Sequence, residues 1–307
     1  MSIAAVVVSF NRIGYLKECL RSLEGQTRSL DEIIVVDNGS TDGSVDYIRS
    51  EHPGVILFET GENLGGAGGF AWGLEIAMAR GHAGAWVMDD DARPELDAFE
   101  PLANAFDSMD PKPSFLASLV TAGRDTFNRR NPPVVSRDAE RQVRAHQHGG
   151  IAIDTATFVG VLINLDLARS THLPFTDFFI WIDDSEYTHR LSRKALALTL
   201  PASQVNHPDL QAKAQDLGPR LFFHIRNSLW YIREKQAVPA TKIADLAALL
   251  QQSVSYGLGS KNKKEWAVAA VKGYSQGLAK RPRRLLPGEL LATLPAERRD
   301  ALIAPAS

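Results

Sequence analysis

The sequence contains a single cysteine, Cys19, among its 307 residues. A lone cysteine excludes an internal disulfide and a metal cluster ligated by cysteines. No apolar run approaches the roughly 20 residues that a membrane-spanning helix requires. Residues 1–10 carry neither the basic region nor the cleavage site of a signal peptide. These absences favour a cytoplasmic protein.

Charge is distributed unevenly in a chain whose composition, 44% hydrophobic and 23% charged, is ordinary for a globular protein. Residues 1–219 hold 19 Lys and Arg against 30 Asp and Glu, a net charge of −11. Residues 220–307 hold 15 against 6, a net charge of +9. The basic part indicates an anionic partner, such as lipid headgroups, a lipid-linked phosphate or the acidic part of the same chain. Residues 280–287, KRPRRLLP, fit a membrane surface or a solvated basic face equally well, and we expect no nucleic acid partner.

Short continuous apolar runs alternate with helical patterns over the first 210 residues. Strands are expected at 3–8, 32–36, 55–58, 85–88, 115–120 and 196–200, and a pair of strands within 151–165. Such runs predict an α/β fold with a mostly parallel, Rossmann-like sheet and helices on both faces. Residues 123–150 show little periodicity and are expected to form an irregular surface excursion. We predict a domain of residues 1–215 followed by a basic helical region of residues 216–307.

The segment WVMDDDA at 86–92 places three acids directly after a buried strand. Ligands gather at the carboxyl ends of strands in such sheets. Because alternate residues of an extended segment point to one side, Asp89 and Asp91 are expected to face one ion, with Asp90 turned away. Carboxylate oxygens suit Mg2+ or Mn2+, with a substrate diphosphate completing the shell. The alternative is a solvated acidic turn that caps the next helix.

Four glycines in ENLGGAGGF, residues 62–70, precede a helix. Glycines at a helix start let backbone N–H groups approach a phosphate or a sugar. A dinucleotide-binding fold fits poorly, because its glycine fingerprint follows the first strand, and here that strand ends in SFNR. The alternative is close packing of the helix on the sheet.

A second apolar run, residues 178–182, ends in Asp183 and Asp184 where another helix begins. These acids are either a second functional carboxylate pair or a helix cap with a first-turn acid. The neighbouring Trp181 suits stacking on a sugar. His207 precedes Pro208 in a turn and is either a metal ligand or a structural histidine.

Together these pieces resemble a family 2 inverting glycosyltransferase of the GT-A fold. The matching segments are VVVSFNR at 6–12, IIVVDNGSTDGS at 33–44, ENLGGAGGF at 62–70, WVMDDDA at 86–92 and WIDDSEY at 181–187. They occur in the family's order over roughly residues 3–210. The glycine segment, the DDD motif and FFHIRNSLWYIR at 222–233 resemble the branch of bacterial galactofuranosyl- and rhamnosyltransferases of cell-wall and surface-polysaccharide assembly.

The resemblance implies a role for each matching residue. Asp37 would bind the nucleotide base, unless it caps a helix, with Ser9 and Arg12 near the base and ribose. The rest of the donor pocket would comprise Asn63, Gly65, Gly66, Gly68, Gly69 and Asp90. Asp89 and Asp91 would hold the cation against the diphosphate, and His207 aligns with a position that can complete the metal shell.

Asp184 would be the general base, and the resemblance places Asp183 and Glu186 beside it as supporting or acceptor-binding acids, with Trp181 at the acceptor. A carboxylate that takes the proton of an acceptor hydroxyl contributes typically about 10²–10⁴-fold in rate. A bound cation neutralises the charge of a departing nucleotide. The chemistry therefore needs two separate carboxylate groups, which the sequence provides.

Arg226 and Asn227 either bind an acceptor phosphate or, as we favour, tie the C-terminal helices to the catalytic domain.

We therefore expect a transferase dependent on Mn2+ or Mg2+ that moves galactofuranose from UDP-galactofuranose, or rhamnose from dTDP-L-rhamnose, to a lipid-linked or polysaccharide acceptor. The expected location is the cytoplasm, at the inner face of the plasma membrane if the basic region contacts lipid. A sugar-1-phosphate nucleotidyltransferase is disfavoured because SFNRIG replaces the glycine-rich basic loop after the first strand. A binding module without catalysis is disfavoured because all the acids are present.

Overall fold

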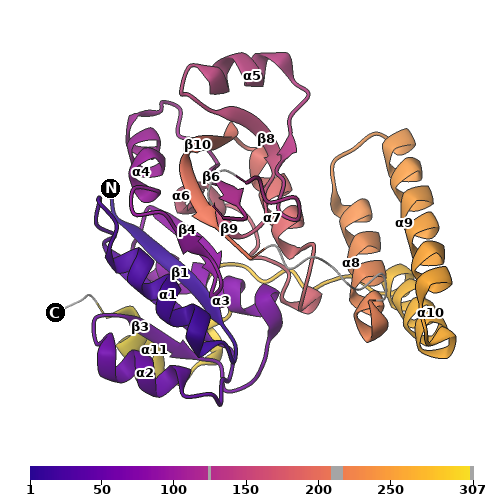
Figure 1. The fold of residues 1–307 in the computed structure, drawn as a ribbon, viewed down its shortest axis with the longest axis horizontal. Helices are drawn as coiled ribbons and strands as arrows, with labels where there is room; N and C mark the ends of the chain where they lie inside the picture. The colour runs from indigo at the N-terminus through magenta and orange to yellow at the C-terminus, as the bar shows by residue number, and fades with distance from the viewer. Residues whose placement is uncertain (124–125, 209–216, 305–307) are drawn as a thin grey trace.

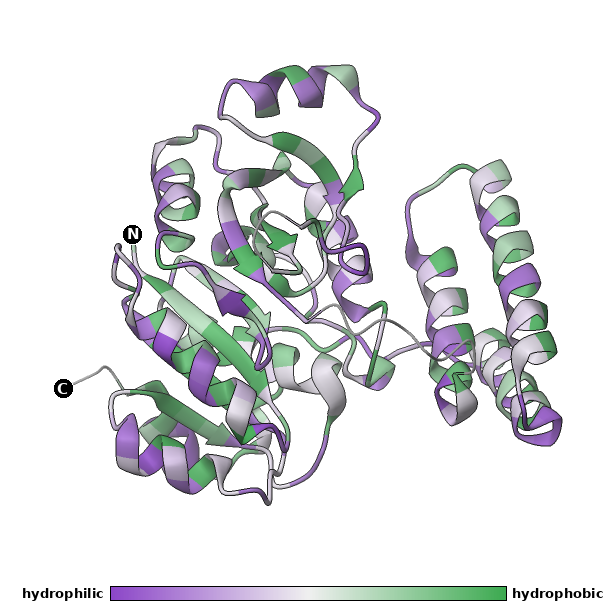
Figure 2. Cartoon of the chain, viewed as in Figure 1, coloured by the Kyte–Doolittle hydropathy of each residue, from purple (hydrophilic) through white to green (hydrophobic). Residues whose placement is uncertain are grey.

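One ten-stranded sheet organises the protein in the computed structural model, which describes residues 1–123, 126–208 and 217–304 (Figure 1). Its first half consists of four parallel strands in the order β3-β2-β1-β4. They are β1 (Ile3–Ser9), β2 (Glu32–Asp37), β3 (Ile56–Glu59) and β4 (Gly84–Asp89). Every residue of β1 is buried, because helices cover both faces, which explains its unbroken apolar run. Figure 2 shows these central strands as strongly hydrophobic.

Helices form a separate core on each face of the sheet. One face carries α1 (Ile13–Glu24), α2 (Ser44–Glu51) and α4 (Phe99–Ser108), and the other carries α3 (Gly65–Ala79) and α7 (Asp183–Ser192). Alternate residues of β1 belong to opposite cores: Ala5 and Val7 pack on the side of α1, and Val6 and Val8 on the side of α3. The α/β class with helices on both faces is confirmed.

Beyond β4 the sheet is mixed. The remaining strands are β5 (Arg93–Pro94), β6 (Phe115–Thr121), β7 (Val134–Val135), β8 (Ile151–Thr155), β9 (Val159–Asn164) and β10 (Ala197–Asn206). β9 lies antiparallel between β4 and β6, and β10 pairs in parallel with β6 and antiparallel with β8. β7 and β5 add short antiparallel pairings to β8 and β10.

Two local expectations were wrong. Residues 151–165 do not pair with each other, because β8 joins β10 while β9 is inserted between β4 and β6. Residues 123–150 are not wholly irregular, since α5 (Ala139–His146) forms there with Asp138 accepting from the N–H of Arg141. Only Ala145 of α5 is buried, so the helix leaves almost no apolar periodicity in the sequence.

Three helices stand beside the sheet in Figure 1: α8 (Leu221–Glu234), α9 (Pro239–Gly259) and α10 (Lys263–Ala279). α10 packs closely on α8, because a Cβ on Gly273 would lie 2.9 Å from Ile225 Cβ, and one on Gly277 would lie 2.6 Å from Leu229 Cδ1. Within the described residues, no helix combines the length and the apolar character needed to cross a bilayer. The shorter helices are α6 (Leu165–Ala168) and the 3-10 turns η1 (Thr176–Phe178), η2 (Gly218–Arg220) and η3 (Leu291–Thr293).

The chain after α10 returns to the sheet domain and ends in α11 (Ala296–Ile303). Glu75 of α3 accepts a hydrogen bond from the N–H of Leu291 at 2.7 Å, and Arg80 Nη1 donates to the carbonyl of Leu302 at 2.6 Å. Leu291 and Leu302 belong to the core on the α3 side. The end of the basic region is therefore built into the sheet domain. The predicted domain boundary at residue 215 lies outside the described residues and stays a prediction.

Candidate active site

The acids that follow β4 lie at the C-terminal edge of the parallel strands. β1 and β4 pair in parallel, so the loop after β1 meets the acidic tip of β4. Asp90 Oδ2 accepts hydrogen bonds from Ser9 Oγ at 3.0 Å and from the N–H of Phe10 at 3.1 Å. Burial raises the pKa of Asp90 to about 6, although these hydrogen bonds oppose the shift. Asp90 therefore orders the loop after β1.

Asp89, Asp91 and His207 form a separate cluster, with one possible ligand atom from each lying within 4.8 Å of the others. His207 follows β10, and its Nε2 lies 3.1 Å from Asp91 Oδ1. Arg12 Nη1 donates to the other oxygen, Asp91 Oδ2, at 2.7 Å. The structure thus brings His207 to the two carboxylates predicted to bind metal, and its role as a ligand stays a prediction.

The electrostatics of this cluster favour a bound cation. Burial raises the pKa of Asp89 well above its usual range, and repulsion from other carboxylates, Asp91 first, adds to the shift. Burial acts in the same direction on Asp91, but the hydrogen bond from His207 and the charges of His207 and Arg12 outweigh it and lower that pKa. Two carboxylates and an imidazole suit Mn2+, whereas Mg2+ prefers oxygen ligands. The residues present therefore fit a divalent cation.

The second acidic pair, Asp183 and Asp184, opens into the same cavity. This acidic cavity has a volume of about 490 Å³, and its walls include Asp89, Asp91, His207, Asp183, Asp184 and Trp181. Burial raises the pKa of Asp183 well above its usual range, with repulsion from Asp184 second, and burial also raises the pKa of Asp184. Two carboxylate groups that are 92 residues apart in the chain, counted from Asp91 to Asp183, therefore share one hollow.

The loop that leads into α7 has a strained backbone and is held in place by hydrogen bonds from α8. Phe179, Trp181 and Ile182 have positive φ angles of 63°, 67° and 72°, and such conformations cost about 1–3 kcal/mol each for non-glycine residues. Asn227 of α8 is fully buried, and its Nδ2 donates to the carbonyls of Phe178, Ile180 and Trp181 at 2.9, 2.9 and 3.1 Å. The expectation that this part of α8 ties the helices to the sheet domain is confirmed.

Arg226, the residue before Asn227, also joins α8 to the sheet domain. Its Nη2 donates to the carbonyl of Asp177 at 2.5 Å and to that of Phe178 at 3.3 Å. The guanidinium lies over the rings of Phe222 and Trp230, with centroid distances of 4.8 and 4.5 Å. Burial lowers the pKa of Arg226 to about 10. The partners of the Arg226 guanidinium are therefore groups of the protein itself.

A second, contiguous hollow of about 310 Å³ lies beside the glycine loop, and we call it the glycine-loop pocket. Predicted residues on its walls are Ser9, Arg12, Asn63, Gly65, Gly66 and Asp90. Asn63 Oδ1 accepts from the N–H of Gly65 at 2.8 Å and so orders the start of α3. Gly65 has a φ of +70°, and a Cβ there would lie 2.0 Å from the carbonyl oxygen of Phe179. Only glycine fits where α3 meets the strained loop.

Gly68 and Gly69 line neither hollow. A Cβ on Gly69 would lie 2.4 Å from Val8 Cγ1, and one on Gly68 would lie 2.6 Å from Leu64 Cβ. These glycines thus allow close packing around α3, which was the alternative interpretation, and their predicted contact with a donor stays a prediction.

Asp37 is buried and is not on the wall of the glycine-loop pocket. Its Oδ2 accepts from the N–H groups of Gly39 and Ser40 at 3.0 and 2.9 Å. Its Oδ1 is buried and has no hydrogen-bond partner within residues 1–123, 126–208 and 217–304. One oxygen thus orders the turn, and the predicted contact of Asp37 with a base stays a prediction. The neighbour Asn38 lies on the pocket wall.

Glu186 lies away from both hollows. Its two carboxylate oxygens accept from Arg190 Nε at 3.0 Å and Nη2 at 2.8 Å. Its predicted contact with an acceptor stays a prediction without a supporting contact. Residues on the walls that the sequence did not single out include Asn38, Arg130, Asn131, Thr157 and Arg220. Asn38 stands next to Asp37 in the DNGS motif, and Phe223, also on a wall, lies in the FFHIRNSLWYIR segment, whereas Arg220 follows the catalytic segments and carries no local signal.

The fold and the shared acidic cavity are those of a sugar-transferring class of protein, and a comparison with family models agrees. Residues 4–164 match the model described as "Glycosyl transferase family 2". The chain belongs to this family.

Among curated relatives, the galactofuranosyltransferase GlfT1 of Mycobacterium tuberculosis (strain CDC 1551 / Oshkosh) is 32% identical to this chain over 204 residues. The aligned part covers 64% of this chain and 66% of that relative. The chain therefore matches just under two thirds of the relative's length.

Solved structures of low sequence identity share the fold. S. aureus TarS 1-349 in complex with UDP has a TM-score of 0.61 at 16% identity, covering 99% of this chain and 83% of that one. The mannosyltransferase PcManGT from Pyrobaculum calidifontis, in complex with GDP-Man and Mn2+, has a TM-score of 0.56 at 20% identity, covering 95% and 78%. The predicted GT-A architecture with a C-terminal helical region is confirmed.

Proposed function

We propose that the protein is a metal-dependent inverting glycosyltransferase that uses a nucleotide-diphosphate sugar as donor. One observation carries this proposal: the Asp89, Asp91 and His207 cluster and the Asp183, Asp184 pair line the same acidic cavity. A metal-binding group and a separate base are the two carboxylate functions that a single displacement at a sugar carbon requires. The donor's nucleotide lies in the glycine-loop pocket, and its sugar reaches into the acidic cavity.

Different residues of the chain would bind the metal and take the proton of the acceptor. Asp89, Asp91 and His207 would hold Mn2+ or Mg2+, which supplies Lewis-acid neutralisation of the leaving diphosphate. Asp184 takes the proton of the acceptor hydroxyl as its oxygen bonds to the anomeric carbon, while the bond from that carbon to the diphosphate breaks and the configuration inverts. Asp183 lies beside Asp184, and burial together with the charge of Asp184 raises the pKa of Asp183 well above its usual range, so Asp183 keeps its proton more readily than an ordinary aspartate.

Galactofuranose from UDP-galactofuranose is the proposed transfer, supported by the relatives named galactofuranosyltransferase and by a fold neighbour that binds UDP. Rhamnose from dTDP-L-rhamnose is the alternative. Sugars differ in the positions of their hydroxyls, and Asn131 on the wall of the acidic cavity has a buried side-chain oxygen without a hydrogen-bond partner among the described residues. This oxygen is suited to accept a hydrogen bond from a sugar hydroxyl.

The proposed acceptor is a lipid-linked glycan or a polysaccharide, met at the inner face of the plasma membrane by an enzyme located in the cytoplasm. Helix α9 supports a peripheral membrane contact, because it exposes a row of apolar side chains at helical spacing: Ile243, Leu246, Leu250, Val254 and Leu258. The surrounding region is basic, which favours anionic lipid. Sedimentation with phosphatidylglycerol vesicles, and not with phosphatidylcholine vesicles, is the expected result.

A panel of sugar nucleotides, incubated with the protein with and without Mn2+, tests the function. We expect release of UDP from UDP-galactofuranose that needs the metal, and its loss in Asp184→Asn with Mn2+-dependent UDP binding retained. Asp166→Asn is the matched control, because Asp166 is an exposed carboxylate paired with Arg169 and lies on neither hollow. Nucleotide binding without turnover of any sugar nucleotide would instead support a binding module. Release of pyrophosphate from a nucleoside triphosphate would support a nucleotidyltransferase.

A further inference from the structure

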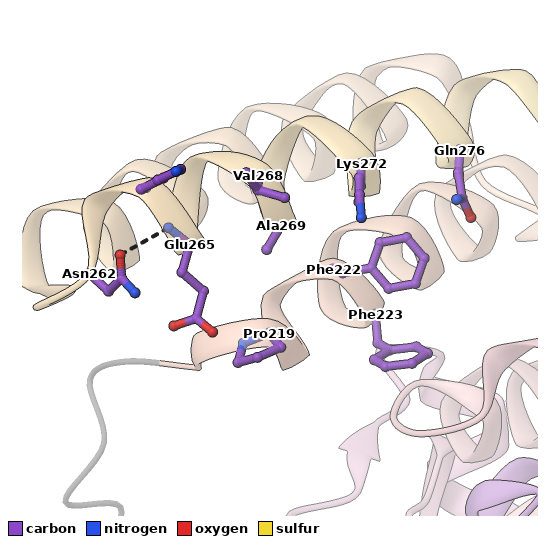
Figure 3. Close-up of a pocket in the computed structure, with 10 residues that line it drawn as sticks. Pro219, Phe222, Phe223, Asn262, Glu265, Val268, Ala269, Lys272 and Gln276 are labelled. Carbon is purple, nitrogen blue, oxygen red and sulfur yellow. Dashed lines mark hydrogen bonds between the residues drawn. The ribbon is translucent and has the colours of Figure 1, made fainter.

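A third hollow, which we call the apolar pocket, lies between the start of α8 and helix α10 (Figure 3). Its volume of about 650 Å³ is within the range of ligand sites, about 300–1,000 Å³. Pro219, Phe222 and Phe223 form one wall, and Val268 and Ala269 of α10 form the other. The other lining residues are polar or charged and include Asn262 and Gln276, but most of the exposed surface of the hollow is apolar, which suits the hydrocarbon part of a ligand better than a sugar or a nucleotide.

The pocket runs beside the contact between α8 and α10. Gly273 and Gly277 bring α10 close to α8 at Ile225 and Leu229. Lys272 and Gln276, each next to one of these glycines, line the pocket, which continues along α10 to Val268 and Lys264. Since α8 and α10 are joined firmly beside it, the pocket belongs to a defined surface of the fold.

Aromatic side chains connect this pocket to the active site. Phe223 lines both the apolar pocket and the glycine-loop pocket. Its ring lies 5.0 Å from that of Phe222 and stacks on Phe179 of the strained loop at 5.2 Å. Arg220, the residue after Pro219, lines the acidic cavity as well. A molecule seated in the apolar pocket would therefore have its end beside Phe223 and Arg220, which border the two hollows of the active site.

The charges at the apolar pocket indicate an anionic group on the ligand. Lys264 and Lys272 line it together with one acid, Glu265. In Figure 3 the Lys272 side chain points from α10 towards the wall formed by Phe222. Apolar walls with two ammonium groups match an amphiphile that carries a phosphate at the end of a hydrocarbon chain.

We propose that the apolar pocket binds the hydrocarbon chain of a lipid-phosphate-linked acceptor, with Lys264 and Lys272 facing its phosphate and its glycan extending past Arg220 into the acidic cavity that contains Asp184. This inference rests on the proposed transferase function, and it names the part of the protein that recognises the acceptor's lipid. The pocket would hold the chain next to the active site and leave the donor site to the glycine loop.

Two valines on α10 provide a matched test. Val268 lines the pocket and is 47% exposed, whereas Val271 is 68% exposed and does not line it. Val268→Glu and Val271→Glu introduce the same charge on the same helix, and neither residue is in the core. Lys272→Met removes the ammonium group without shortening the side chain much. Val268→Phe fills the pocket without adding charge.

Titration calorimetry with the whole protein would use farnesyl phosphate as the ligand. Farnesol and inorganic phosphate, titrated separately, would distinguish the contribution of the hydrocarbon chain from that of the phosphate charge. We expect Val268→Glu and Val268→Phe to weaken farnesyl phosphate binding at least tenfold and Lys272→Met to weaken it several-fold. Val271→Glu should bind like the wild type, farnesol should bind more weakly than farnesyl phosphate, and inorganic phosphate should not bind measurably. UDP binding with Mn2+ should be unchanged in all four variants.

Equal binding of farnesyl phosphate by the Val268 and Val271 variants would overturn the pocket assignment, as would tight binding of inorganic phosphate alone. A wild-type protein that binds UDP with Mn2+ but not farnesyl phosphate would also overturn it, while leaving the proposed transferase function intact. A wild-type protein that binds no nucleotide would instead count against the transferase function itself.

Discussion

Replacing Asn227 with alanine removes the side chain that holds the loop in front of Asp183 and Asp184. Asn227 Nδ2 donates to the carbonyls of Phe178, Ile180 and Trp181. Its Oδ1 also accepts from Arg226 Nε at 3.0 Å and Nη2 at 2.9 Å. An ordinary hydrogen bond contributes about 1 kcal/mol net, so losing the two N–H donors and this acceptor should lower the free energy of unfolding by about 3 kcal/mol. We expect a folded protein with a modestly lowered Tm.

The effect on catalysis should be much larger than the effect on stability. Three residues of the loop hold positive φ angles that cost about 1–3 kcal/mol each, so the loop relaxes locally once Asn227 no longer holds it. A shift of about 1 Å in a catalytic group can cost about 10²-fold in rate. We therefore expect kcat for transfer to fall at least about 10²-fold in Asn227→Ala, with Mn2+-dependent UDP affinity nearly unchanged.

Asn164→Ala supplies the matched control for this substitution. Asn164 is also buried, its Nδ2 donates to the carbonyl of Pro113 at 2.9 Å, and it pairs with Gly84 at the end of β4 remote from Asp89. Its Oδ1 also accepts from the N–H groups of Asp166 and Leu167 at 3.1 and 3.4 Å, so Asn164→Ala should lose a similar amount of stability and keep kcat. If both variants lost kcat in proportion to their Tm, Asn227 would be no more than a stabilising residue and the positioning argument would fail.

Three further changes test other parts of the site and the fold. Asp89→Asn or treatment with EDTA should abolish Mn2+-dependent UDP binding in calorimetry, and unchanged binding would remove Asp89 from the metal site. Burial raises the pKa of Asp184, so the base loses its proton at a higher pH than an ordinary aspartate, and kcat/KM should rise with pH through that value; a profile flat down to pH 4 would contradict this. Hydrogen bonds from Arg80, then His82, lower the pKa of Glu32. Its stabilisation is therefore fully present above the ordinary value of about 4.3 and lost as pH falls through the lowered pKa. In urea unfolding, Glu32→Gln should lower the free energy of unfolding more at pH 7 than at pH 3. Equal losses at the two pH values would refute the link between the lowered pKa of Glu32 and stability.

Local sequence patterns predicted most of the sheet domain because burial on both faces leaves a local signature. The apolar runs at 3–8, 32–36 and 85–88 became β1, β2 and β4 with small changes at their ends. Pairing partners were less predictable, since a strand's neighbours come from elsewhere in the chain. β9 lies between β4 and β6, a placement that its own sequence does not encode.

The sequence by itself determined the chemical groups of this protein: acids at the ends of two apolar runs, a glycine loop before a helix, and a basic C-terminal part. Chain order and residue type are enough for these, because they depend on neighbours within a few positions. Only the tertiary structure decided that the two acidic tips share one cavity, that Asn227 of α8 holds the loop before the base, and that Phe223 joins the apolar pocket to the active site. Each of these rests on contacts between segments far apart in the chain, and such contacts are set by the packing of the whole sheet and its helices.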